Sequence, residues 1–183
     1  MALKRDILLI AFLGLNCVLI AANLLLRKDN SELRTQVKIL RAVNAPLPGT
    51  PITKLQGYDD NGKAKDLDFT AQHKDSLLFV FSVDCPYTKS VLPQWKKLMR
   101  DSNANIVFVE TSGEVKRQFF SDRGMAAPEN LLIISPQTRS QNRLAAVPST
   151  VLINRDGKVM ESWIGDLDHN DIDEIHRAML FPN

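Results

Sequence analysis

Cysteine is scarce in this chain of 183 residues, which has only Cys17 and Cys85. Cys17 falls in an uncharged N-terminal run and Cys85 in the part expected to fold as a domain, so a disulfide within that domain is excluded. A fold stabilised by internal disulfides is therefore ruled out, and the cysteine usage fits any redox compartment.

The sequence also has few histidines, and its positive and negative charges nearly balance. The 23 Lys and Arg residues against 21 Asp and Glu residues give a formal net charge of +2, which offers no electrostatic footprint for nucleic acid. The three histidines, His73, His169 and His176, have no metal-ligand spacing. We therefore expect no nucleic-acid partner, no metal site and no bound cofactor.

One long uncharged run is present, at residues 7–26. Its length matches the roughly 20 residues that a helix needs to cross a bilayer, whereas a signal-peptide core usually has about 7 to 15. We favour an uncleaved transmembrane anchor over a cleaved signal peptide or a lipoprotein signal at Cys17. Lys4 and Arg5 in the short tail, residues 1–6, favour an inside N-terminus. This predicts a single-pass protein of a bacterial inner membrane whose soluble domain faces the periplasm.

Two segments follow the anchor. Residues 27–44 are expected to form a helical stalk, because their apolar residues recur at helical spacing. Barely two heptads are present, so a homodimer formed through the stalk would be weak. The proline-rich residues 45–51 end that helix and open a domain at residues 45–183.

The domain alternates strand and helix patterns. A hairpin is expected where Asn61 and Gly62 supply positive backbone angles. Strands are expected at residues 52–58, 63–68, 77–83, 106–110, 131–135, 150–154 and 158–163, and helices around residues 91–99, from residue 114 and from residue 170. This order indicates an α/β fold with a mixed central sheet flanked by helices.

Cys85 is the strongest candidate for a reactive residue. It follows the buried strand directly and precedes a helix expected to start near Pro86, where unpaired N–H groups and the helix dipole favour a thiolate. The alternative is a buried structural cysteine. Tyr87 and Thr88 either contact a partner, with Thr88 donating to the thiolate, or are ordinary residues of a helix start. Glu110 is an acid or base near this site or, more often, a solvated strand end.

Three segments together resemble the thioredoxin fold, and within it the membrane-anchored TlpA-like (redoxin) branch of thiol–disulfide oxidoreductases. They are residues 79–88, similar to the strand and active-site turn that normally reads Cys-x-x-Cys, Pro93, similar to the proline that bends the next helix, and residues 147–159, similar to the cis-proline loop, strand and hairpin. The resemblance covers about residues 45–181. A peroxiredoxin pattern fits less well, because Leu78 stands where that family has proline.

The resemblance implies roles for individual residues. Cys85 would be the nucleophile, Pro148 a cis proline lying against it, and the Val147 backbone a source of strand-like hydrogen bonds to a partner. Thr88 replaces the second cysteine, so dithiol cycling within this chain is excluded. Asp84 stands where the family commonly has tryptophan, and its negative charge opposes a thiolate.

These observations lead to two functional hypotheses. The first is single-cysteine thiol–disulfide exchange through Cys85 with a thiol- or disulfide-bearing protein or a small thiol, in which an external thiol resolves the mixed disulfide. The second is a redox-inactive binding module that holds a partner in the groove near Pro148. The departures at Asp84 and Thr88 favour the second.

Overall fold

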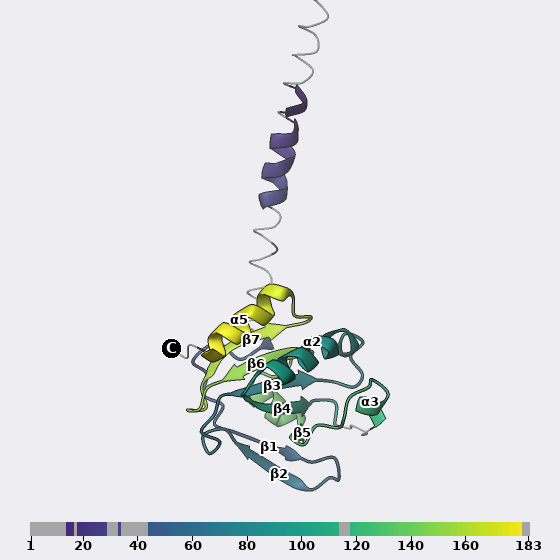
Figure 1. Ribbon diagram of the computed structural model, residues 1–183, viewed down its shortest axis with the longest axis vertical. Coiled ribbons are helices and arrows are strands. Elements are labelled where there is room, and N and C mark those ends of the chain that lie inside the picture. The colour runs from purple at the N-terminus through teal and green to yellow at the C-terminus, as the bar shows by residue number, and fades with distance from the viewer. Residues whose placement is uncertain (1–13, 17, 29–32, 34–43, 114–117, 181–183) are drawn as a thin grey trace, which may run out of the picture. The chain divides into compact units, whose positions relative to one another are not determined.

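The computed structural model describes residues 14–16, 18–28, 33, 44–113 and 118–180 (Figure 1). The chain divides into two compact units, Met1–Leu40 and Arg41–Asn183. All the strands described lie in the second unit, which also contains Cys85.

A sheet of seven strands runs through the second unit in the order β2-β1-β5-β4-β3-β6-β7 (Figure 1). β4 pairs in parallel with β3 and β5, and the remaining neighbours are antiparallel. This confirms the mixed α/β sheet that the sequence predicts. The strands are β1 (Lys54–Tyr58), β2 (Ala64–Asp68), β3 (Ser76–Phe81), β4 (Asn105–Glu110), β5 (Leu131–Ile133), β6 (Ser149–Ile153) and β7 (Val159–Ile164).

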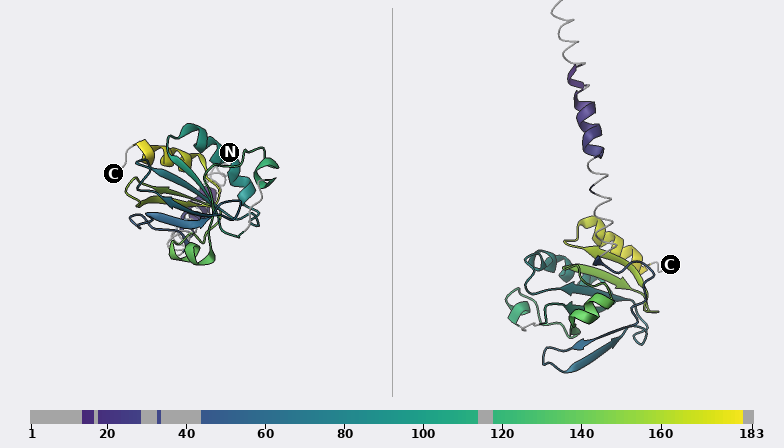
Figure 2. Two further views of the ribbon diagram at one scale, coloured as in Figure 1. Left: turned by 90° about the horizontal axis from the view of Figure 1, so that it is seen from below. Right: turned by 180° about the vertical axis from the view of Figure 1, so that it is seen from behind.

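Helices cover both faces of the sheet. α2 (Thr88–Asp101) and α5 (His169–Leu180) lie on one face, and the short α4 (Pro136–Gln141) lies on the other (Figure 2, left). The remaining helix, α3 (Gln118–Ser121), packs its buried Phe120 into the core under α2 and α5.

The central strand β3 explains the apolar run that marks it in the sequence. All six of its residues are buried. Alternate side chains point to opposite faces of a strand, so Phe79 and Phe81 join the core under α2 and α5, whereas Leu78 and Val80 join the core on the other face. The strand ends at Phe81, two residues before the predicted end, and the chain turns there towards Cys85.

Two helices differ from the sequence prediction. α4 was not predicted, although Ser135 accepts a hydrogen bond from the Thr138 N–H at 3.1 Å and Pro136 occupies the first helical turn. The helix predicted from residue 114 is described only over α3, because residues 114–117 lie outside the described residues.

Trp95 fastens α2 to the sheet. Its ring stacks on Phe79 of β3 with the centroids 4.8 Å apart and the planes 12° from parallel. Its indole N–H donates to Thr150 Oγ1 of β6 at 2.9 Å. One fully buried side chain thus joins the helix that follows Cys85 to the strand that follows Pro148.

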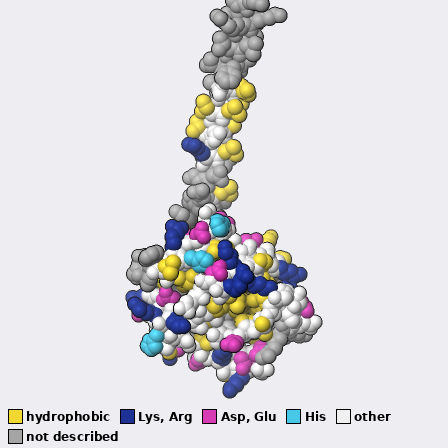
Figure 3. All heavy atoms as spheres, in the orientation of Figure 1, with side chains coloured by type: hydrophobic (Ala, Val, Ile, Leu, Met, Phe, Trp, Pro, Cys, Tyr) yellow, Lys and Arg dark blue, Asp and Glu magenta, His cyan; other side chains and the backbone are white. Residues whose placement is uncertain are grey.

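The first unit is described only in part. Residues 18–28 are helical, and the large apolar side chains between Leu15 and Leu26 are more than half exposed (Figure 3). Within the described residues, no helix combines the length and the hydropathy needed to span a membrane. Residues 7–13 and 17 of the predicted anchor, and most of the predicted stalk, lie outside the described residues. The anchor, the stalk and its weak homodimer therefore stay predictions.

Candidate functional site: the turn that carries Cys85

Cys85 lies in a turn between the carboxyl end of β3 and the first residue of α2. Its side chain is half-buried and is a free thiol. The Thr88 N–H donates to the Cys85 carbonyl oxygen at 3.1 Å. α2 begins at Thr88, two residues later than predicted near Pro86, which is exposed in the turn itself. Cys85 therefore lies three residues before the first residue of α2, beyond the amino end of this helix.

The Val147–Pro148 peptide bond is cis, as the resemblance implied. Pro148 is buried directly before β6, which pairs with β3. This pairing brings the loop to the Cys85 turn, and Cys85 Sγ donates to the Val147 carbonyl oxygen at 3.5 Å. Residues 62 positions apart in the chain thus meet at one site.

Ser82 organises the turn around the cysteine. Its carbonyl oxygen accepts hydrogen bonds from the Cys85 N–H at 3.2 Å and from the Thr88 hydroxyl at 2.8 Å. Its own hydroxyl oxygen accepts the Asp84 N–H at 3.1 Å. Sequence reasoning assigned Ser82 no such role, although serine at the start of a turn commonly bonds the backbone two residues on.

Thr88 is a structural residue in this site. Its side chain is 1 % exposed and its hydroxyl is used by Ser82, so it neither contacts a partner nor donates to the Cys85 thiolate. Of the two alternatives for Thr88, this geometry favours an ordinary residue of the helix start, because the hydroxyl satisfies a buried carbonyl oxygen. Tyr87, in contrast, is 66 % exposed, so a partner can reach it.

One carboxylate lies in the Cys85 turn, and another is hydrogen-bonded to the first turn of α2. Asp84, directly before Cys85, is exposed. Asp166, in the loop after β7, accepts a hydrogen bond from the Ser90 hydroxyl of α2 at 2.7 Å. The only basic side chain in the first turn of α2 is Lys89. Carboxylates close to a thiol disfavour the thiolate, so the helix dipole and the local charges act in opposite directions.

Glu110 joins the Cys85 turn to the loop that follows β4. Its side chain is completely buried, contrary to the expectation of a solvated strand end. Oε1 accepts the N–H groups of Val83 at 3.4 Å and Ser112 at 2.8 Å and also the Ser112 hydroxyl, while Oε2 accepts the Gly113 N–H at 2.8 Å. These four hydrogen bonds to two loops indicate a structural role for Glu110 and not that of an acid or base at the reaction.

Metal chemistry has no visible support in this part of the molecule. Among residues 44–113 and 118–180, and in the described parts of the first unit, no three His, Cys, Asp or Glu side chains cluster in a way that could hold a metal ion.

Comparison with known proteins places the fold. No model of a protein family and no curated protein matches the chain. Among solved structures, a DsbF homologue from Corynebacterium diphtheriae is 14% identical with a TM-score of 0.55. The match covers 71% of this chain and 87% of the homologue's chain. A putative thioredoxin from Neisseria meningitidis is 20% identical with a TM-score of 0.54, at 75% and 94% coverage. A thiol:disulfide interchange protein of the thioredoxin family from Chlorobium tepidum TLS is 20% identical with a TM-score of 0.53, at 75% and 100% coverage.

These likenesses cover 71% to 75% of the chain. Identities this low establish a common architecture and leave the activity to be argued from the site itself. The chain has a thioredoxin-like fold, and its structural neighbours are thioredoxin-like thiol–disulfide oxidoreductases.

Proposed function

We propose that this chain carries out thiol–disulfide exchange with Cys85 as its single reactive cysteine. The observation that supports this most is the position of Cys85 Sγ, half-buried at the carboxyl end of β3 and 3.5 Å from the carbonyl oxygen that precedes the cis proline Pro148. A thiol in that position lies next to backbone that can pair with an extended segment of a partner.

The reaction proceeds by two sulfur exchanges. The Cys85 thiolate attacks one sulfur of a partner's disulfide, a bond forms between Cys85 Sγ and that sulfur, and the partner's S–S bond breaks. The departing sulfur leaves as a thiolate and takes up a proton from water. A thiol of a second protein or of a small molecule, itself deprotonated, then attacks the mixed disulfide and releases Cys85 as a thiolate. Cys85 ends in the oxidation state in which it began.

An external thiol is required because of what occupies the place of the second cysteine. Thr88 is buried and its hydroxyl is bonded to the Ser82 carbonyl oxygen. No other described residue is a cysteine. The partner of this chain is therefore a thiol- or disulfide-bearing protein or a small thiol.

A redox-inactive binding module at the same groove is the second candidate, and one observation favours it. The exposed carboxylate of Asp84 lies directly before Cys85, and a negative charge beside a thiol opposes the thiolate that exchange requires. In this alternative Cys85 is dispensable, and the loop at Val147 and Pro148 holds the partner.

The rate of Cys85 alkylation against pH separates the two candidates. The full-length Cys17→Ala variant leaves Cys85 as its only thiol. Thiol–disulfide exchange predicts that alkylation reaches half its maximal rate at a lower pH than it does for N-acetylcysteine amide, which has no carboxylate, measured in parallel. A midpoint at or above that of N-acetylcysteine amide, or no labelling, rejects exchange and supports the binding module. Asp84→Asn is the control, because removing its charge should lower the midpoint whichever function holds.

We further propose that residues 7–26 anchor the chain in a bacterial inner membrane, with residues 27–44 as a stalk and the domain in the periplasm. The uncharged run and the exposed apolar side chains between Leu15 and Leu26 support the anchor. The chain should stay in the membrane pellet after alkaline carbonate treatment, and protease added to spheroplasts should digest its domain. Recovery of the intact chain in the carbonate supernatant would contradict the anchor.

A further inference from the structure

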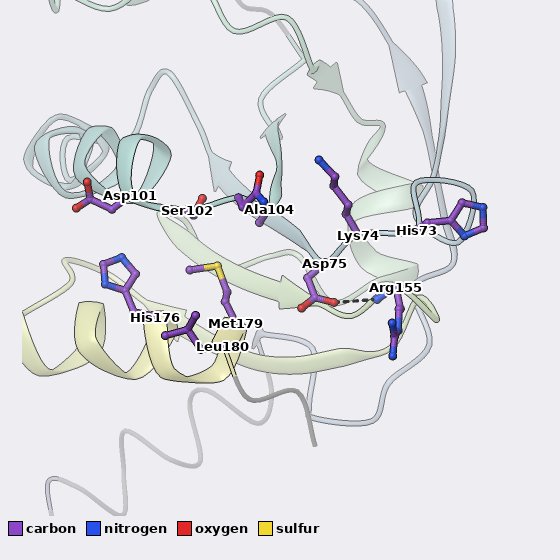
Figure 4. Close-up of a pocket in the computed structure, with 11 residues that line it drawn as sticks. His73, Lys74, Asp75, Asp101, Ser102, Ala104, Arg155, His176, Met179 and Leu180 are labelled. Carbon is purple, nitrogen blue, oxygen red and sulfur yellow. Dashed lines mark hydrogen bonds between the residues drawn. The ribbon is translucent and has the colours of Figure 1, made fainter.

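A cavity of about 530 Å³ lies at the other end of β3 from Cys85. Its lining comes from the residues before β3, from the end of α2 and the residues after it, from the turn after β6 and from the end of α5 (Figure 4). The six residues of β3 span about 20 Å, so the cavity is a place separate from the thiol. Its volume falls within the roughly 300 to 1,000 Å³ of small-ligand sites.

Charges of opposite sign lie at the two ends of this cavity. Asp101 lies at one end, and Lys74, Asp75 and Arg155 lie at the other (Figure 4). Asp75 Oδ1 accepts the Arg155 backbone N–H at 3.1 Å, so that end carries two cationic side chains against one carboxylate that is already hydrogen-bonded. A ligand with one positive and one negative end matches this arrangement.

The wall between the charged ends is apolar. Met179 and Leu180 line it from α5, and Ala104 lines it from the chain after α2 (Figure 4). Met179 is half-buried, whereas Leu180 is 72 % exposed. Covering exposed apolar surface in a cavity with apolar groups of a ligand is favourable, because it removes that surface from water. The middle of the ligand is therefore apolar.

Two polar atoms in the same lining have no partner. Ser102 Oγ and His176 Nε2 are buried and make no hydrogen bond with any described residue. Buried polar groups without a partner are uncommon and costly. A peptide backbone in the cavity supplies both donors and acceptors for such groups.

We propose that this cavity binds a short zwitterionic peptide with apolar side chains. Its ammonium group lies at Asp101, its carboxylate at Lys74 and Arg155, its apolar side chains lie on Met179 and Ala104, and its backbone engages Ser102 and His176. This site is independent of Cys85 and holds whichever function the thiol has.

Calorimetric titration of the full-length protein with trileucine tests the proposal. Trileucine should bind, and triglycine should bind at least about tenfold more weakly because it offers no apolar side chains. N-acetylated trileucine and trileucine amide, which lack one terminal charge each, should each bind about threefold more weakly, the size typical of a solvent-accessible ion pair. Absence of trileucine binding at millimolar concentration overturns the proposal.

A thermodynamic cycle assigns each charge to its residue. In Asp101→Asn, acetylation of the peptide should cause no further loss of affinity, and in the double variant Lys74→Gln, Arg155→Gln the same should hold for amidation. The exposed residues Asp122 and Lys63 lie outside the cavity, so Asp122→Asn and Lys63→Gln should keep the full effect of both peptide modifications. An equal effect of acetylation in wild-type protein and in Asp101→Asn overturns the assignment of the ammonium group.

Discussion

Replacing Glu110 by glutamine should destabilise the domain without changing its shape. The carboxylate of Glu110 is fully buried and accepts four donors from two loops. Glutamine keeps one oxygen, which can still serve the three donors at Oε1. Its amide nitrogen then faces the Gly113 N–H, which loses its acceptor.

The magnitude follows from these bonds. A buried N–H left without an acceptor costs about 1 to 3 kcal/mol, and bonds to a charged group are stronger than bonds to a neutral one by about 1 kcal/mol. The Val83 bond, at 3.4 Å, contributes little to this difference. The free energy of unfolding of Glu110→Gln should therefore fall by roughly 3 kcal/mol.

Urea unfolding followed by tryptophan fluorescence measures this change. Both tryptophans of the chain, Trp95 and Trp163, are buried in the domain core and report on its unfolding. Glu129→Gln, at an exposed position, is the matched control and should shift stability by less than about 0.5 kcal/mol. If Glu110→Gln is as stable as Glu129→Gln, the carboxylate does not hold the two loops. Faster hydrogen exchange at the Gly113 amide should accompany the loss of stability.

Three further perturbations have expected outcomes. Thr88→Val removes the hydroxyl that satisfies a buried turn carbonyl and should lower the free energy of unfolding by about 1 to 3 kcal/mol in the same urea assay, whereas an unchanged stability argues against this bond. Gly57→Ala places a Cβ against a carbonyl oxygen of β5, so the β1 to β5 pairing should loosen, and β1 amides that exchange no faster than in wild type contradict this. The Thr70 hydroxyl and the Lys54 ammonium group lower the pKa of Asp68 to about 2. The folded pKa lies below the unfolded value of about 3.9, so this contribution to stability is present above pH ~4 and is lost as the pH falls towards 2. An NMR titration of Asp68 should show this low pKa and its rise in Thr70→Val.

Local patterns predicted much of this fold. The apolar run of β3, the alternation of strand and helix and the turn at Gly62, where φ is +76°, each depend on residues close in sequence. The pairing of Cys85 with Pro148 came from a resemblance that spans distant segments, and the structure places the two loops in contact. These features could be predicted from the sequence because each has a local or a motif-level signature.

Glu110 and Thr88 show why other features of the site could not be predicted from the sequence. Whether a carboxylate at a strand end is solvated depends on which loops fold over it, and the donors to Glu110 come from the loop that follows β4 and from the turn after β3. The hydrogen-bond partner of the Thr88 hydroxyl is a carbonyl oxygen six residues earlier, which only the folded turn brings near. The cavity likewise combines the ends of α2 and α5, which no sequence spacing relates.

The single hydrogen bond between Trp95 and Thr150 has a consequence for how any partner meets this site. α2 follows the Cys85 turn and β6 follows Pro148, so a bond in the core between these two elements holds the two loops in position. The site is therefore preorganised, and the loss of conformational freedom on association falls mainly on the partner. Partners that are already extended and rigid near their cysteine should therefore associate more tightly than flexible peptides of the same sequence.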